Sequence, residues 1–211
     1  IKIIVIDSDV NSSQVSCRIG TNNLQAGIKA AEAALATDDE ELYIGIVNYD
    51  VNSANGQQRE LGFRQTVEQD PRVKNITTIN VLSTTEDARA GAKEMLLSDS
   101  RINVVVTFNE WTSLGVGWAI RDLNRADRIQ VVAFDSNVVS VGMLETGEVD
   151  ALIVQNPYAM GYLGVETAAN LMNGQTGGPS VVDTATTIVT RENMYEPESQ
   201  KILFSFEEEG Y

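Results

Sequence analysis

The fold class is decided by the stretch Asn103-Val104-Val105-Val106-Thr107-Phe108-Asn109-Glu110-Trp111. Its valines and phenylalanine run without polar alternation, which predicts a strand buried on both faces, as in a parallel sheet. Polarity changes abruptly at Asn109, and residues 111–124 then show apolar side chains at helical spacing. The stretch therefore predicts a buried strand that delivers Asn109 to its carboxyl end, where a helix begins.

Three further stretches repeat this design, with an apolar run followed by Asn, Asp or Ser. They are Ile3-Ile4-Val5-Ile6-Asp7-Ser8, Ile44-Gly45-Ile46-Val47-Asn48-Tyr49-Asp50 and Gln130-Val131-Val132-Ala133-Phe134-Asp135-Ser136. Strand and helix patterns alternate nearly throughout the chain, so we expect an α/β fold with a doubly wound, largely parallel sheet. Such sheets bind ligands at the carboxyl ends of their strands, which makes these polar strand ends the candidate site.

The other elements follow from periodicity and capping. Helices are expected after Asn22 and over 57–68, 138–145 and 157–172, and another begins where Ser83, three residues before Glu86, forms a capping box. Further strands are expected at 14–20, 76–82, 149–154, 186–190 and 202–206, and the tail 207–210 is expected to be frayed.

Composition excludes several classes of protein. The 211 residues are 43% hydrophobic, which suits a packed core. A formal net charge of -15 argues against a nucleic-acid partner, because nothing offsets repulsion by phosphates. There is no His, and the lone Cys17 gives neither a disulfide framework nor a metal cluster. Cys17 is expected to be a buried strand residue, and no apolar run approaches the ~18 residues of a membrane span.

No pattern in the sequence supports catalysis. A P-loop, a dinucleotide-binding G-x-G-x-x-G and a G-x-S-x-G elbow are all missing. Asp7, Asp50 and Asp135 could gather a cation, but the mixture of Asp, Asn, Arg and Gln at the strand ends favours a different ligand. We therefore expect a protein that is not an enzyme and that has no catalytic residue, metal or cofactor.

The strand-end residues suit a neutral polyhydroxy ligand. Each sugar hydroxyl donates and accepts a hydrogen bond; Asp accepts, Arg donates through a planar fork, and Asn or Gln does both. A cleft lined with these side chains can satisfy several adjacent hydroxyls. Strand-end Asp and Asn are also common helix caps, and capping explains each position, taken singly, equally well.

Blocks along nearly the whole chain carry a family resemblance. They are Val5-Ile6-Asp7, Gln58-Arg59-Glu60-Leu61-Gly62-Phe63, Phe108-Asn109-Glu110, Val132-Ala133-Phe134-Asp135, Val154-Gln155-Asn156-Pro157 and Gly161-Tyr162-Leu163-Gly164. In their order and spacing the chain resembles the periplasmic sugar-binding proteins of the ribose/galactose type. These share their fold, that of the type I periplasmic binding proteins, with the effector domains of LacI-type repressors.

The resemblance implies a set of ligand-binding residues: Asp7, Arg59, Asn109, Asp135 and Gln155. The chain also departs from the family pattern. Ser8 stands where an Arg often follows the first Asp, and no aromatic residue occurs around Ser83, where the family often has one. Tyr49 or Trp111 could supply the apolar face for the sugar, although a helix residue packed at the lobe rim explains Trp111 as well.

The resemblance also implies a division into lobes joined by three crossing segments. Residues 1–20 would be a remnant strand and crossing segment of the N-terminal lobe, and 21–154 the C-terminal lobe. Residues 155–180 would add a helix of the N-terminal lobe, and 181–211 a crossing segment, the last strands and the tail. The expected crossings lie near 19–22, 155 and 181–184.

The implied function is binding of a pentose or hexose between the lobes, as the solute receptor of an ABC importer with a membrane permease as partner. The alternative is a sugar-sensing effector domain of a LacI-type repressor or a histidine-kinase sensor. The receptor would be extracytoplasmic, in the periplasm or lipid-anchored, and the repressor cytoplasmic. No nucleic acid is expected to bind this segment.

A further expectation concerns surface left by missing strands of the N-terminal lobe. Apolar side chains there should be exposed and favour self-association or association with a missing N-terminal piece. They are Ile4, Ile6, Tyr162, Leu163, Val165 and Leu171.

Overall fold

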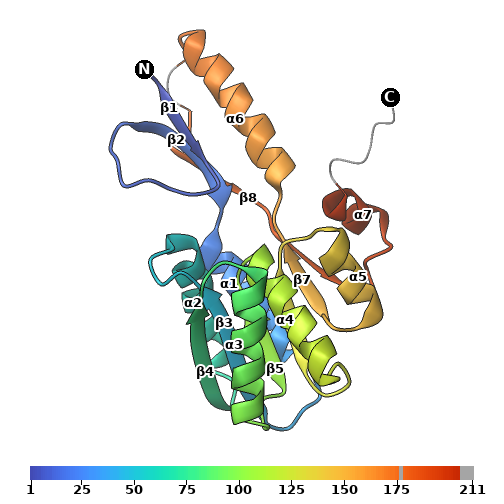
Figure 1. Cartoon of the computed structure of the whole chain (residues 1–211). Helices are drawn as coiled ribbons and strands as arrows, with labels where there is room; N and C mark the ends of the chain where they lie inside the picture. Colours follow the sequence, from blue (N-terminus) through green and yellow to red (C-terminus); the bar gives the residue numbers. More distant parts are fainter. Residues whose placement is uncertain (176–177, 205–211) are drawn as a thin grey trace.

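The computed structural model describes residues 1–175 and 178–204, which form two groups of elements joined by a narrow waist (Figure 1). The smaller group is a three-stranded parallel sheet in the order β1-β2-β8, covered by helix α6. Its elements are β1 (Ile3–Ile6), β2 (Val15–Thr21), β8 (Val181–Thr184) and α6 (Pro157–Met172).

The larger group is built on a six-stranded sheet in the order β4-β3-β5-β6-β7-β9. Neighbouring strands are parallel except for β9, which runs antiparallel to β7. The strands are β3 (Leu42–Tyr49), β4 (Val73–Val81), β5 (Val104–Thr107), β6 (Gln130–Phe134), β7 (Ala151–Val154) and β9 (Thr187–Thr190). The predicted α/β class is confirmed, as is the parallel arrangement of the strands expected at 42–48, 103–108 and 129–134.

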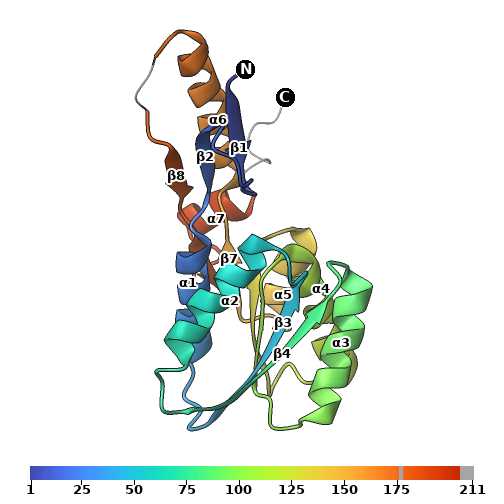
Figure 2. The same ribbon diagram turned by 90° about the vertical axis from the view of Figure 1, so that its left-hand side faces the viewer.

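Helices cover both faces of the larger sheet, as Figure 2 shows. Helices α1 (Asn23–Leu35) and α2 (Ala54–Val67) pack with Val104, Val106 and other residues on one face. On the other face, α3 (Thr85–Ser98), α4 (Glu110–Leu123) and α5 (Val138–Thr146) pack around Val105, with α7 (Pro197–Leu203) nearby. The valines of β5 face alternate cores, which explains why the run Val104-Val105-Val106 contains no polar residue.

Two glycines allow α1 and α2 to approach closely. A Cβ atom at Gly27 would collide with the carbonyl oxygen of Arg59, and one at Gly62 with the carbonyl oxygen of Leu24. Both obstacles are backbone atoms, so they cannot move aside without shifting a helix. The contact fixes the position of α2, which carries Arg59.

Gly27→Ala is therefore expected to lower the free energy of unfolding by about 1–3 kcal/mol, the usual range for overpacking. Urea denaturation measures the change. The matched control is Gly142→Ala in α5, where an added Cβ meets no atom within 4 Å. There, alanine is expected to be neutral or to stabilise by up to about 1 kcal/mol. Equal effects of the two substitutions would contradict the close-approach explanation.

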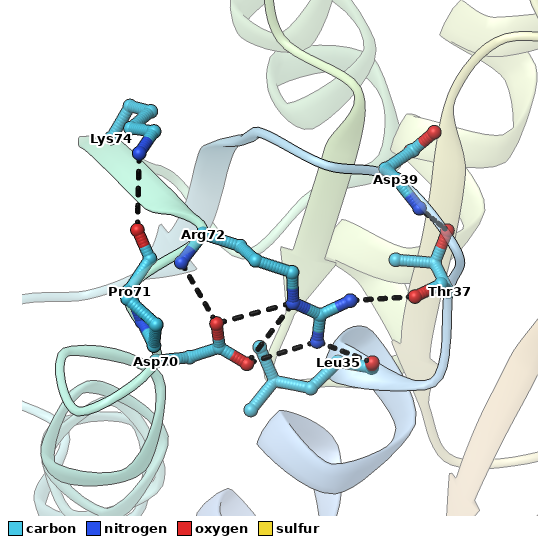
Figure 3. Close-up of polar contacts among 7 residues, drawn as sticks. All are labelled: Leu35, Thr37, Asp39, Asp70, Pro71, Arg72 and Lys74. Carbon is cyan, nitrogen blue, oxygen red and sulfur yellow. Dashed lines mark hydrogen bonds and ion pairs between the residues drawn. The ribbon is translucent and has the colours of Figure 1, made fainter.

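Arg72 ties the end of α1 to the start of β4 (Figure 3). Its Nη1 donates to the carbonyl of Thr37 at 2.6 Å and its Nη2 to that of Leu35 at 2.9 Å. These bonds satisfy carbonyls at a helix end, where intrahelical donors are lacking. Arg72 also pairs with Asp70 at 2.9 Å, and this hydrogen bond lowers the pKa of the Asp70 carboxyl. The cluster therefore holds the C-terminal end of α1 against the start of β4.

Several predicted boundaries are wrong. Thr84, not Ser83, caps α3, because α3 begins at Thr85 and the Thr84 side chain accepts from the backbone N–H of Asp87. Helix α2 begins three residues earlier than expected, because Ser53 caps it. Forming strand β8 does not contradict the crossing expected at 181–184, which stays a prediction.

The strand expected at 202–206 is also wrong over its described part. Ile202 and Leu203 belong to helix α7, which has Pro197 in its first turn, and Leu203 packs into the larger core. Residues 205 and 206 and the tail expected to be frayed lie outside the described residues. Among the described residues, no helix is both long and apolar enough to span a membrane.

The smaller sheet has a small core of its own. Cys17 is buried there beside Ile19 and Met160, so the prediction for Cys17 is confirmed. Of the apolar side chains expected on the surface, Ile6, Tyr162 and Val165 are exposed. Ile4, Leu163 and Leu171 are half-buried, so the expected exposure is wrong for these three. Ile4 and Leu163 also pack against this core. Association through the exposed side chains stays a prediction.

Candidate functional site

Two aspartates at strand ends share an uncommon backbone conformation. Asp7 follows β1 and Asp135 follows β6, and their φ angles are 66° and 67°. The backbone N–H of Asp7 donates to Ile19 at 2.9 Å and that of Asp135 to Ile153 at 3.0 Å, which extends each strand pairing by one bond. A left-handed residue other than Gly costs about 1–3 kcal/mol, and such residues concentrate at functional sites. The equivalent turns identify both aspartates as candidate functional residues.

A pocket of about 310 Å³ lies between the two groups of strands, near the small end of the usual range for ligand sites. Asp7 lines it from the smaller group, and Glu110, Asp135 and Gln155 line it from the larger group and the waist. The remaining wall is mostly apolar and is formed by Ile6, Val154, Pro157 and Met160, with Ser136 at its edge. The pocket thus combines carboxylates from both groups with an apolar surface.

Gln155 connects the polar residues of the site. Its Oε1 accepts from Nη2 of Arg59 at 2.8 Å, and its Nε2 donates to Oδ1 of Asp135 at 2.5 Å. The same Oε1 accepts from the hydroxyl of Thr21 at 2.7 Å. Because Thr21 and Gln155 lie on two of the three segments that cross the waist, this network joins the site to the waist.

Arg59 lies directly behind the pocket and is only 2% exposed. Its Nε donates to Oδ1 of Asn23 at 2.8 Å, and its Nη1 donates to the carbonyl of Phe108 at 2.7 Å. The guanidinium also lies 4.8 Å from the ring centroid of Phe134. With Gln155 on Nη2, each of the three nitrogens makes a hydrogen bond within the protein, so Arg59 holds Gln155 in place. Two of its five N–H groups are not used by these bonds, and direct binding of a ligand by Arg59 stays a prediction.

Burial raises the pKa of the Asp135 carboxyl above its ordinary value. The charge of Arg59 and the hydrogen bond from Gln155 act in the opposite direction. A partly desolvated carboxylate is a strong acceptor for a hydroxyl that enters the pocket. Within residues 1–175 and 178–204, no group of acidic or Cys side chains is arranged to hold a metal ion.

The three waist segments are also bonded to one another. In addition to the Thr21–Gln155 bond, Nδ2 of Asn22 donates to Asp183 at 3.2 Å. The hydroxyl of Thr184 donates to the carbonyl of Gly20 at 3.2 Å. An uncommon strand-end conformation thus lies on each side of the pocket, with hydrogen-bonded segments between the two groups of elements.

The comparisons with known proteins agree with this geometry. A family model described as "Periplasmic binding protein domain" matches residues 1–176. The chain belongs to this family. As a periplasmic binding protein, it is similar to two curated proteins: a D-ribose/D-allose-binding protein of Pseudomonas aeruginosa, and the ribose import binding protein of Haemophilus influenzae.

The first of these is 28% identical over 150 residues, which cover 70% of this chain and 47% of the relative. The second is 25% identical over 182 residues, or 83% of this chain and 59% of the relative. The chain therefore spans about half the length of its curated relatives. These names confirm the resemblance to sugar-binding proteins of the ribose type, which are transport proteins and not enzymes.

Solved structures of periplasmic binding proteins superpose closely on the chain. A carbohydrate transporter solute-binding protein of Agrobacterium radiobacter, in complex with D-arabinose, is 29% identical with a TM-score of 0.91. The match covers 96% of this chain and 70% of that one. A periplasmic component of a sugar transport system from Hahella chejuensis is 30% identical with a TM-score of 0.85, over 90% of this chain and 70% of that one.

Three of the five residues implied by the resemblance, Asp7, Asp135 and Gln155, line one pocket of this periplasmic binding protein, and Arg59 supports them. Asn109 does not line it. Its Oδ1 caps α4 by accepting from the backbone of Thr112, and its Nδ2 donates to Ser83 at 2.6 Å. Participation of Asn109 in ligand binding stays a prediction.

The three less central candidates lie around the pocket. Ser8 lines a neighbouring cavity of about 340 Å³, which Asp7 also lines. The Ser8 hydroxyl donates to Oδ2 of Asp7 at 3.3 Å. The Tyr49 ring packs against the core beside Gly56, and Trp111 is half exposed. Neither aromatic residue lines the pocket, so the apolar wall comes instead from the strand and helix residues around it.

The sequence analysis missed three residues of the site: Thr21, Asn23 and Glu110. Asn23 stands at the start of the helix expected after Asn22, and nothing in its spacing showed that it anchors Arg59 from another helix. Thr21 lies on the segment near 19–22 that was expected to cross between the lobes. That position could have indicated Thr21 as a residue near the site. Glu110 lies within the decisive stretch itself, directly after Asn109, but only Asn109 was proposed there as a ligand-binding residue.

Proposed function

We propose that the chain forms part of the solute receptor of a sugar importer, which binds a pentose or hexose between its two groups of strands. One observation carries this proposal: Asp7 from one group and Asp135 and Gln155 from the other line a single pocket. A ligand there contacts both sides of the waist at once. Family membership and the sugars named for the related structures support it.

Binding would work by closure at the waist. A sugar that hydrogen-bonds to Asp7 and to Asp135 interacts more strongly with a closed form than with an open one. It shifts the equilibrium by this difference in affinity. The hydrogen bonds among the waist segments, such as Thr21 to Gln155, place Asp135 and Gln155 in position before the sugar arrives.

The proposed partner is the permease of an ABC importer, which would recognise the closed form. An extracytoplasmic location accompanies this proposal, because related receptors of this family are periplasmic. In this account the ligand is held by side chains alone, without a metal or cofactor.

Isothermal titration calorimetry of the 211-residue chain against a panel of pentoses and hexoses tests the function. We expect at least one aldose or ketose to bind, with saturation at one site per chain. The affinity is expected to fall below that of the full-length relatives, since each loss of about 1.4 kcal/mol of contact is a factor of ten. The linear alditol of the bound sugar serves as a control with similar hydroxyls and no ring. No binding across the panel, or equal binding of ring and alditol, would overturn the proposal.

A further inference from the structure

We propose that Arg18 is a positioning residue for ligand binding, which holds the loop after β1 and thereby fixes Asp7 at the pocket. The inference deepens the proposed function and rests on it, because it takes Asp7 as one of the residues that bind the ligand. Arg18 itself does not line that pocket, so its effect on the ligand passes through the loop and Asp7.

The loop between β1 and β2, residues 7–14, has little packing to hold it in place. Because the two strands are parallel, the chain must return along the sheet, and here it does so without a helix. Figure 1 shows the loop standing out from the sheet, and all its residues except Ser12 are exposed. A segment with few buried contacts opens at low free-energy cost, so the hydrogen bonds that reach this loop decide its conformation.

Arg18, in β2, supplies the bonds that hold the loop to the sheet. Its Nε donates to Oδ1 of Asp9 at 2.6 Å, and its Nη2 donates to the carbonyl of Ser12 at 2.9 Å and to that of Val10 at 3.3 Å. In the described part of the chain, the other hydrogen bonds of residues 8–13 join residues at most two positions apart. Among the described residues, Arg18 is therefore the one that ties this loop to a neighbouring strand.

A comparison with Asp135 shows why Asp7 needs such a tie. Both aspartates adopt the left-handed conformation, which persists only where the surrounding structure fixes it. After Asp135, the chain enters α5 within three residues, and the capping box of Asn137 fixes the turn. After Asp7 no helix begins, and beyond the contact with Ser8 the loop is held by Arg18. Arg18 thus does for Asp7 what a helix start does for Asp135.

Loss of Arg18 is expected to affect binding more than stability. Without it the loop is released, and Asp7 relaxes towards ordinary extended backbone for much of the time. Only the molecules with Asp7 in place bind the ligand fully, so the apparent affinity falls in proportion to their fraction. The ion pair with Asp9 lies at the surface, with the two side chains 29% and 59% exposed, and such pairs contribute little to stability.

The test is Arg18→Met in the 211-residue chain, titrated by calorimetry with the sugar that binds best in the panel. We expect the affinity to fall about tenfold, as when about one molecule in ten keeps Asp7 in place. Arg101→Met is the matched control. Arg101 is also exposed and pairs with Asp99 at 2.7 Å, but it precedes β5, at the opposite end of that strand from the site. Its loss is expected to leave the affinity unchanged, and thermal unfolding is expected to show both variants folded.

A double-mutant cycle shows whether Arg18 acts through Asp7. In the Asp7→Asn background, the further change Arg18→Met is expected to alter the affinity by less than about twofold, because the residue that Arg18 positions is already altered. The full loss, repeated in that background, would mean that Arg18 acts independently of Asp7, and it would overturn the inference.

Amide hydrogen exchange, followed by NMR without any sugar, gives a second readout. The backbone N–H of Asp7 donates to the carbonyl of Ile19 at 2.9 Å, directly before the loop. It is expected to exchange about tenfold faster in Arg18→Met and at the wild-type rate in Arg101→Met. This readout also decides the case in which Asp7→Asn binds too weakly to titrate.

Unchanged affinity of Arg18→Met, unchanged exchange at Asp7, or a variant that fails to fold would each overturn the inference while the proposed function stood. No sugar binding by wild type would overturn both.

Discussion

Arg59→Met is expected to lower the free energy of unfolding by about 2–5 kcal/mol and to remove measurable sugar binding. The variant leaves Oδ1 of Asn23 and the carbonyl of Phe108 without their donor, and each buried acceptor left unpaired costs about 1–3 kcal/mol. Gln155 would keep its bond from Thr21 but lose the support that aligns it with Asp135. Urea denaturation measures the stability and calorimetry the binding.

Arg64→Met is the control for this prediction, because Arg64 lies on the same helix and is about 30% exposed. Its ion pair with Glu60 is only partly buried, so its loss is expected to cost less than that of the bonds of the fully buried Arg59. If both variants unfolded at the same urea concentration, Arg59 would not be the buried support of the site.

Asp135→Asn is expected to weaken sugar binding by about 10–150-fold, the loss of about 1.5–3 kcal/mol for a hydrogen bond to a charged group. Asn is preferred over Ala, because Asn tolerates the left-handed conformation that Asp135 adopts with φ 67°. If the Asn oxygen accepts from Gln155, the Asn NH₂ group takes the place of Oδ2 of Asp135. A sugar hydroxyl that donates to Oδ2 would then meet a donor instead of an acceptor. Calorimetry with the bound sugar measures the loss.

The same substitution is expected to stabilise the sugar-free chain. Burial raises the folded-state pKa of Asp135 above its unfolded value, so folding favours the protonated carboxyl. Stability from this group is full below the unfolded pKa, about 3.9, and is lost as the pH rises through the folded pKa. Asp135→Asn should therefore raise the Tm at pH 7, and its advantage should shrink towards pH 4. Asp127→Asn removes the same charge from the exposed surface and is the control. A Tm of Asp135→Asn below that of wild type at pH 7 would contradict this explanation.

The strands and most helices could be predicted from the sequence because their signals are local. The valines of β5 reveal burial on both faces, and Asn156-Pro157 marks the start of α6. The ends of the elements were harder to predict. Ser83 and Thr84 offer similar caps, and the choice depends on where the chain leaves β4. Over residues 202–204, the strand expected at 202–206 failed because Ile202 and Leu203 fit one side of a short helix equally well.

The site could be predicted from the sequence only in part. Strand-end positions located Asp7 and Asp135, because parallel strands bring their carboxyl ends together. Their left-handed backbone carries no sequence signal, since Asp is also common in caps. That Arg59 is turned inward, with every nitrogen engaged, depends on Asn23 and Phe108 from distant elements. Long-range contacts of this kind are set by packing, and no single-sequence pattern encodes them.

A crystal structure of the 211-residue chain with the tightest-binding sugar of the panel tests the central claim most directly. We predict electron density for one sugar in the pocket of about 310 Å³, within hydrogen-bond distance of both Asp7 and Asp135. Sugar bound elsewhere on the chain, or bound by one of these aspartates without the other, would contradict the claim that the ligand joins the two groups of strands.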